Sequence, residues 1–371
     1  MHRNIFISGN GRSGSNILLD CLDLSQYTHC RNEPHSFKTS PFYQQILQHL
    51  YFDPTQFNID DIESNILDPN FDLSDSLNQH WDSILEHMQH HWSDRDRIIP
   101  NGEKKNYING LFWDTGLFQF LNKKNQLRKK LSVVIPSFKG SEFQFPSWFF
   151  NDSWGKDTVH VFKVLKTIEF CYSWLSENYP QTPIIHLIRY PGGFYKSLTS
   201  RFFSKYDEQG KKVFETINKI MLSKRLNLAK EKNITFPEVD IDSMNLLACT
   251  FWNWLVMNEL IYSHYAKKSL IKLVVFENLI CDPINEFKSI YDYCGLPWSP
   301  IIEEQIGYVF SQSAKTALSF REALSTSDQN FINKTLQYSS LPELWSEQLW
   351  QNIESLADKQ KSASITYDPF K

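Results

Sequence analysis

Short apolar runs alternate with segments of helical periodicity in the N-terminal and middle parts of this chain. Residues 4–8 form an apolar run suited to a buried strand, and residues 17–24 have the apolar spacing of a helix. The rhythm returns with a strand-like run over 159–165, helical spacing over 168–179 and a second buried strand over 182–188. A strand–helix–strand of this length is typical of a parallel βαβ unit. We therefore predict an α/β fold with a central parallel sheet flanked by helices on both faces.

The rest of the chain breaks this rhythm. Residues 40–155 are predicted to be a long insertion or lid, and residues 201–240, which are charged, a second and helical insertion. A long helix is expected over 244–268, followed by a strand over 270–276. We interpret residues 1–371 as a single domain that carries these insertions.

A glycine-rich loop joins the first predicted strand to the first predicted helix. Its sequence, GNGRSGSN, covers residues 9–16. Glycines allow the backbone to approach an anion closely, and the unpaired N–H groups of a helix's first turn face it. The pattern predicts a phosphate cradle, with an ordinary tight strand-to-helix turn as the alternative. The residues expected to line this cradle are Gly11, Arg12, Ser13, Gly14, Ser15 and Asn16.

The loop departs from the nucleoside-triphosphate pattern G-x-x-x-x-G-K-[ST]. Gly9 and Gly14 keep the glycine spacing, but Ser15 stands at the lysine position and Asn16 at the hydroxyl position. The basic group lies inside the loop instead, as Arg12. A loop with backbone donors, hydroxyls and one cation, but with no evident Mg²⁺ ligand, suits a leaving group less charged than a triphosphate.

The segment GRSGS, residues 11–15, resembles the 5′-phosphosulfate loop of sulfotransferases that use 3′-phosphoadenosine 5′-phosphosulfate (PAPS) as sulfuryl donor. A second segment resembles the 3′-phosphate motif of this family: Arg189 closes a buried strand and Ser197 follows on the next predicted helix. Arginine offers a planar fork to phosphate oxygens. The common R-D-P-R form is altered, with Tyr190 for the acidic residue and Gly192 for the second basic one. The resemblance implies a P-loop-like sulfotransferase fold that binds PAPS, and its product PAP, through both segments.

Two further segments extend the resemblance toward the C-terminus. Residues 276–279 (FENL) and 295–298 (GLPW) are similar to the Y-E-D-L…G-L-P-W block of the family, in which Glu277 is expected to support the fold rather than the chemistry. The family also returns basic residues to the nucleotide from its C-terminal part. Lys315 and Arg321 are both candidates here, and the sequence does not separate them.

The general base has three candidates. The family implies an acidic residue after the second strand, which makes Glu33 the first choice and His35 the second. A surface ion pair between Glu33 and Arg31, or a neighbouring Arg or Lys, is the alternative interpretation. Many relatives follow a Lys-Thr pair with a catalytic histidine, but residues 166–167 are followed here by Ile-Glu, which leaves Glu169 as the third choice.

This resemblance implies in-line sulfuryl transfer to a hydroxyl or amine. Glu33 would take the proton, while Arg12 and the loop N–H groups would offset charge on the leaving phosphate oxygen. Such catalysis is positional and electrostatic, so no metal is expected. The alternatives are an atypical P-loop kinase for a small molecule and a non-catalytic nucleotide-binding protein of the same fold. The acceptor, expected to be a small molecule, is not identified by the sequence.

Composition limits the partners and the compartment. The chain has 41% hydrophobic residues, including 28 Phe, 16 Tyr and 11 Trp, and a net charge of -4, which provides no electrostatic footprint for nucleic acid. The six scattered cysteines favour buried thiols over disulfides. The early first strand leaves no room for a signal peptide, and no apolar run reaches membrane-spanning length. We expect a soluble cytoplasmic protein of unknown oligomeric state. His87 and His91 lie one helical turn apart, but a solvated helix face is favoured over a metal site.

Overall fold

The structure, a computed structural model, contains a five-stranded parallel sheet flanked by helices, in the strand order β2-β7-β1-β8-β9. This confirms the predicted α/β class. The strands are β1 (Asn4–Gly9), β2 (Thr28–Asn32), β7 (Val159–Lys163), β8 (Ile184–Ile188) and β9 (Lys272–Val275). The structure describes residues 4–11, 13–25, 27–36, 40–47, 72–92, 97–100, 132–134, 143–144, 159–164, 168–198, 207–267, 271–311, 313–322 and 325–363.

The carboxyl ends of three neighbouring strands are in register. β7 pairs in parallel with β1 on one side and with β2 on the other. Lys163, the last residue of β7, stands opposite Ile7 of β1 and opposite Asn32, the last residue of β2. The backbone ladder continues past this point, because the N–H of Glu33 donates to the Lys163 carbonyl over 2.9 Å. Ligands of open α/β sheets bind at this end of the strands.

The chain forms two compact units. The first contains most of the chain before His186, together with Phe287–Tyr308; the second contains His186–Glu286 and the C-terminal part from Val309. The expectation of one domain over the whole length stays a prediction.

In the first unit, helix α1 (Ser15–Leu22) packs against β1, β2 and β7. Aromatic rings build the adjoining core, with Trp81 lying 6.0 Å from Phe6 and 5.0 Å from Trp174 between ring centroids. The predicted insertion contributes two antiparallel strand pairs, β3 with β6 and β4 with β5. The remaining bounds here are η1 (Tyr43–Leu47), α4 (Leu73–His90), β3 (His91–Trp92), β4 (Arg97–Pro100), β5 (Ser132–Val134), β6 (Phe143–Gln144) and α8 (Ile168–Asn178).

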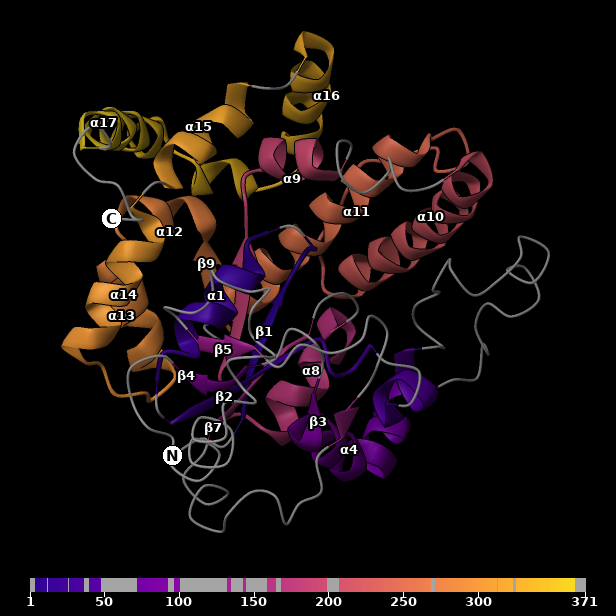
Figure 1. Cartoon of the computed structure of the whole chain (residues 1–371). Helices are drawn as coiled ribbons and strands as arrows, with labels where there is room; N and C mark the ends of the chain where they lie inside the picture. The colour runs from indigo at the N-terminus through magenta and orange to yellow at the C-terminus, as the bar shows by residue number, and fades with distance from the viewer. Residues whose placement is uncertain are drawn as a thin grey trace. The chain divides into compact units, whose positions relative to one another are not determined.

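The second unit is built around two long helices that lie side by side, α10 (Glu208–Glu231) and α11 (Leu246–Leu260) (Figure 1). α11 has no polar face, and all of its residues from Phe251 to Leu260 are buried, as a core helix requires. The predicted long helix is confirmed, although it continues as a π-helix, η6 (Ile261–Ala266). The other helices of the chain are α9 (Pro191–Ser197), α12 (Phe276–Cys281), α13 (Pro283–Tyr293), α14 (Pro300–Phe310), α15 (Ser313–Glu322), α16 (Thr326–Leu336), η7 (Leu341–Leu344) and α17 (Glu347–Ala363).

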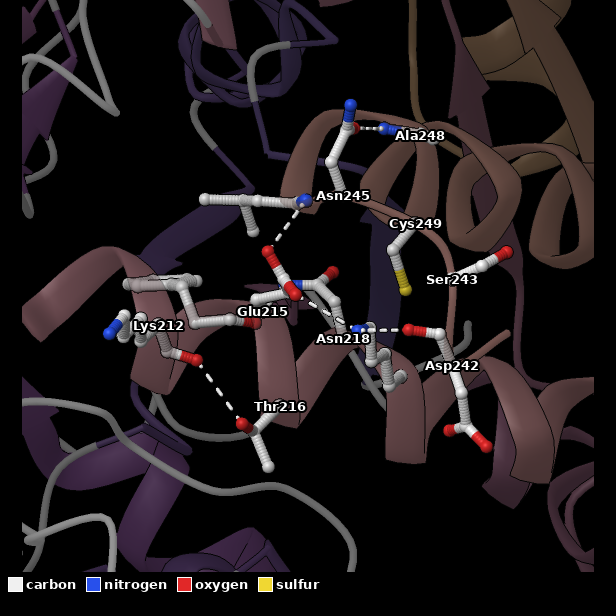
Figure 2. A network of polar contacts seen from close by, with 12 residues as sticks. Lys212, Glu215, Thr216, Asn218, Asp242, Ser243, Asn245, Ala248 and Cys249 are labelled. Carbon is white, nitrogen blue, oxygen red and sulfur yellow. Dashed lines mark hydrogen bonds and ion pairs between the residues drawn. The ribbon is translucent and has the colours of Figure 1, made fainter. Parts of the chain in front are cut away.

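A polar network joins the start of α11 to α10 (Figure 2). The ammonium group of Lys219 donates to Glu215 and to the Asp242 carbonyl, each over 2.9 Å. The second carboxylate oxygen of Glu215 accepts from the Leu246 N–H, and Asn245 caps α11 by accepting from the Ala248 N–H over 2.9 Å (Figure 2). These bonds satisfy N–H groups that a helix start leaves without an intrahelical partner.

The cysteines and the apolar content of the helices are further features of the fold. All six cysteines, which lie in the described part of the chain, are thiols, and five of them are buried. Among the described residues, no helix is both long enough and apolar enough to cross a membrane.

Candidate functional site

The glycine-rich loop has the predicted strand–loop–helix geometry. β1 ends at Gly9 and α1 begins at Ser15, with Gly14 as its N-cap at φ 97° and ψ 10°. This left-handed conformation strains any residue with a Cβ, so glycine is the residue that permits the turn. No side chain caps α1, and its first turn contains no acidic residue. The helix therefore presents its first N–H groups and the positive end of its dipole without a built-in anion.

Buried donors without partners accompany that helix start. Among the described residues, neither the Ser13 hydroxyl nor the Asn10 amide nitrogen has a hydrogen-bond partner. Ser13 is 2% exposed, so its hydroxyl has lost water as well. A Cβ added to Gly11 would meet no described atom within 4 Å, so the loop is open at that point. Unsatisfied buried donors of this kind cost free energy unless a ligand completes them, and an oxyanion does so. Arg12 lies outside the described residues.

A buried ammonium group lies next to the loop helix. Lys163, only 2% exposed, donates to the side-chain oxygens of Asn16 over 2.6 Å, Asn32 over 2.8 Å and Glu33 over 2.9 Å. The three acceptors come from the first turn of α1 and from the carboxyl end of β2. The structure thus brings two predicted site residues, Asn16 and Glu33, into one cluster. Lys163, which belongs to neither of the two predicted motifs, holds them together.

Glu33 is held in an unusual backbone conformation. Its φ of 54° lies in the left-handed region, which a residue with a Cβ adopts at a cost. Its carboxylate pairs with Lys163 while 34% of its side chain stays exposed. Arg31, the partner considered in the sequence analysis, donates to the Gln89 carbonyl over 2.9 Å. An ionised, partly exposed carboxylate at the strand end can accept a proton from a bound molecule.

Of the other two candidates for the general base, the structure describes the side chain of His35 but not that of Glu169. His35 is 2% exposed and lies edge-on against Phe42, with 5.7 Å between ring centroids. Its burial favours Glu33 over His35 for contact with an acceptor. The Glu169 side chain and residues 165–167 lie outside what the structure describes, so that candidate stays untested.

The second unit contains the predicted arginine anchor. Arg189 follows β8, is 9% exposed and lies over the Phe276 ring, with 4.9 Å from its Cζ to the ring centroid. Gly193 makes room for it, because a Cβ there would come within 2.8 Å of the Arg189 Nε. The absence of a side chain at Gly193 thus leaves the space that the arginine side chain occupies.

Glu277 supports this turn, as expected. It is 2% exposed; its two carboxylate oxygens each accept from the Tyr190 N–H over 3.1 Å, and one also accepts from the Trp345 indole over 2.8 Å. Burial raises the pKa of Glu277, while the Trp345 hydrogen bond and the Arg189 charge oppose that rise. The Tyr190 ring packs edge-on against Trp345 and Trp350, which gives this departure from the family pattern a packing role.

Of the remaining candidate nucleotide-binding residues, the structure describes only some of the side chains. Ser197 ends α9, and its side chain lies outside the described residues. Lys315 is exposed on α15, a helix that packs against α9. The Arg321 side chain also lies outside the described part, so the choice between Lys315 and Arg321 stays open.

Two histidines outside these clusters, His186 and His87, are also buried. His186 is a buried strand histidine with a hydrogen-bond partner: its Nε2 lies 3.0 Å from the Asn258 side-chain oxygen, and desolvation lowers its pKa to about 4. His87, predicted on a solvated face, is only 8% exposed. Within the described ranges, no cluster of three or more His, Cys, Asp or Glu residues is placed to hold a metal ion.

Comparison with known proteins yields distant structural likenesses. No protein-family model matches the chain, and no curated protein matches it. A sulfotransferase domain from the curacin biosynthetic pathway is 13% identical, with a TM-score of 0.36 over 81% of this chain and 77% of that one. The sulfotransferase domain of the Synechococcus PCC 7002 olefin synthase is 13% identical, with a TM-score of 0.33 over 99% and 96%. Sulfotransferase STF9 from Mycobacterium avium is 12% identical, with a TM-score of 0.31 over 84% and 68%. Values this low establish neither the family nor an activity for this chain.

Proposed function

We propose that this protein is a PAPS-dependent sulfotransferase, which transfers a sulfuryl group to a hydroxyl or amine of an acceptor. The observation that carries the proposal is the uncapped start of α1, with the unpartnered donors of Ser13 and Asn10 beside it. Hydroxyl, amide and backbone N–H donors fit the oxygens of a phosphosulfate. The GRSGS and Arg189/Ser197 segments add the resemblance that selects this anion over other phosphates.

The residues of the chain have separate roles in this proposal. The loop N–H groups, Ser13 and Arg12 bind the 5′ end and offset the charge that grows on the leaving phosphate oxygen. Arg189 and Ser197 bind the 3′-phosphate. PAPS would supply the sulfuryl group, whose sulfur–oxygen bond to phosphate breaks as a new bond to the acceptor forms. Glu33 accepts the proton that the acceptor loses in that step.

The acceptor and the compartment are further parts of the proposal. We place the enzyme in the cytoplasm, because all of its cysteines are thiols and the cytoplasm is a reducing compartment. A net charge of -4 favours a small-molecule acceptor over a sulfated polysaccharide, which would require a basic groove.

Nucleotide preference tests the proposal directly. In isothermal titration, PAP should bind more tightly than AMP by about 1.5–3 kcal/mol, the range for hydrogen bonds to a charged group, because only PAP carries the 3′-phosphate. Binding should not require Mg²⁺. Arg189→Ala should reduce PAP affinity to that of AMP and leave AMP affinity unchanged. Transfer from radiolabelled PAPS to a panel of phenols, alcohols and amines then identifies the acceptor.

Two results would redirect the proposal. ATP binding as tightly as PAP, or an absolute need for Mg²⁺, would favour the small-molecule kinase. Tight PAP binding with no transfer to any acceptor class would favour the non-catalytic nucleotide-binding protein.

A further inference from the structure

The Lys163 ammonium group joins two elements that the chain brings together from distant segments. Lys163 ends β7; Asn16 lies on the first turn of α1, and Asn32 and Glu33 lie at the end of β2. The three contacts measure 2.6, 2.8 and 2.9 Å. An ammonium group has three N–H donors, so these acceptors match its full donor capacity. In this arrangement, Lys163 can influence a bound anion through its neighbours rather than by touching it.

The contact with Lys163 determines whether the oxygen or the nitrogen of the Asn16 side-chain amide can contact a ligand. An ammonium group donates and cannot accept, so the amide atom that faces it must be the oxygen. The amide nitrogen, with its two N–H donors, is then the end that remains. A donor on the first turn of α1 suits an anion, whereas an acceptor there would repel one.

The charge of Lys163 is compensated within the same cluster. A buried ammonium group is costly without a partner, and the Glu33 carboxylate provides the opposite charge at 2.9 Å. The exposed third of the Glu33 side chain leaves it accessible while it stays paired. The contact that orients Asn16 therefore also fixes the candidate proton acceptor.

We propose that Lys163 is a positioning residue of the donor site: it orients the Asn16 amide with its nitrogen toward the bound anion and holds Glu33 beside that anion. The inference rests on the proposed function, and it assigns a role to a residue outside both motif segments. A purely structural ion pair would stabilise the unit without acting on nucleotide affinity through Asn16.

A double-mutant cycle on PAP affinity tests this role. The proteins compared by isothermal titration are the wild type, Lys163→Met, Asn16→Ala and the double variant. Lys163→Met and Asn16→Ala should each weaken PAP binding roughly tenfold, and the double variant should bind no more weakly than either single one. Lys211→Met is the matched control, because Lys211 pairs with exposed Glu208 on α10, and it should bind PAP as the wild type does.

The outcomes separate this inference from the proposed function. Thermal unfolding establishes that each variant is folded; if Lys163→Met is not, Lys163→Gln, which keeps an amide donor but no charge, replaces it in the cycle. Equal weakening by the Lys163 substitution with and without Asn16 would mean direct contact with the anion and overturn the positioning role. Unchanged PAP affinity in the Lys163 variant would overturn it as well, with the proposed function intact. A wild type that does not prefer PAP to AMP would overturn both.

Discussion

Glu33 combines a left-handed backbone conformation with an ion pair to a buried lysine. Residues held in such sparsely populated conformations cluster at functional sites, where the surrounding structure keeps them in place. Here the backbone bond from the Glu33 N–H to the Lys163 carbonyl and the side-chain bond to the Lys163 ammonium act together. Both the backbone and the side chain of Lys163 therefore fix the position of the Glu33 carboxylate.

We expect Glu33→Gln to lower kcat by roughly 10²- to 10⁴-fold, the usual worth of general acid–base catalysis. Glutamine keeps the size and one acceptor for Lys163 but has no basic oxygen, so PAP affinity should stay within a few-fold of the wild type. Transfer from radiolabelled PAPS measures the first effect and titration the second. If Glu33→Gln stays active while His35→Asn or Glu169→Gln loses the activity, the base is that other residue.

Gly193 gives a second test at the scale of one residue. A Cβ at this position would lie 2.8 Å from the Arg189 Nε and 3.2 Å from its Cζ, so Gly193→Ala must displace the guanidinium group. PAP affinity should fall toward that of AMP, by about tenfold or more if one charged hydrogen bond is lost, and AMP affinity should not change.

The control for this substitution is Gly307→Ala. A Cβ on Gly307, in α14, meets no described atom within 4 Å, and alanine is the better helix former. Nucleotide affinities should therefore stay those of the wild type. Equal loss of PAP and AMP affinity in the Gly193 variant would contradict the assignment of Arg189 to the 3′-phosphate.

At the scale of elements, β8 and α11 share a buried polar contact. His186 in β8 and Asn258 in α11 are both about 1% exposed and lie 3.0 Å apart at their side-chain polar atoms. Desolvation lowers the pKa of His186 from 6.5 to about 4. Between these two pKa values the unfolded chain binds a proton at His186 and the folded chain does not. The free energy of unfolding therefore decreases as the pH falls from the unfolded pKa toward the folded one.

We expect His186 to make unfolding pH-dependent in this window. Between about pH 7.5 and about pH 5 the wild type should lose about 2 kcal/mol of unfolding free energy through this group. His186→Gln has no group that titrates at this position. The difference in unfolding free energy between the wild type and His186→Gln, measured by urea unfolding, should therefore change by that amount between the two pH values. A matched substitution, His80→Gln on half-buried His80 of α4, serves as the control. A difference between the wild type and His186→Gln that does not vary with pH would refute the assignment.

At the scale of the whole molecule, the two predicted motifs belong to different compact units. The glycine-rich loop lies in the first unit, and the Arg189 turn, supported by Glu277, lies in the second. The proposal assigns the 5′ end of the nucleotide to the loop and its 3′-phosphate to the arginine. The comparison of PAP with AMP tests the assignment of the arginine, since only PAP carries a 3′-phosphate.

Four of the five strands of the main sheet, β1, β7, β8 and β9, and the glycine-rich turn could be predicted because their causes are local. Apolar runs near residues 4–9, 159–163 and 184–188 indicate buried strands by themselves, and a glycine at position 14 permits a conformation that other residues resist. Arg189 was identified by its resemblance to a family motif, in which an arginine directly follows a buried strand. Within one segment, neighbouring residues are enough to set backbone conformation and period.

Features that depend on distant segments could not be predicted in this way. Lys163 is, with His160, one of two polar residues in an otherwise apolar strand, and that position was the available signal. His87 has the pattern of an exposed helix face, but packing in the first unit buries it. The place of β1 between β7 and β8 likewise depends on which strands pair, and local periodicity carries no information on pairing.

The sequence by itself determined the α/β class and the glycine-rich loop, while the candidacies of Arg189 and Glu33 came from resemblance to family motifs. Tertiary structure alone decided that Lys163 meets Asn16, Asn32 and Glu33, because these side chains come from separate strands and a helix that only the folded sheet brings together. It also decided that Glu33 pairs with this lysine. The reason is physical: hydrophobic period and backbone preference act over a few residues, whereas the pairing of buried charges depends on contacts between distant parts of the chain.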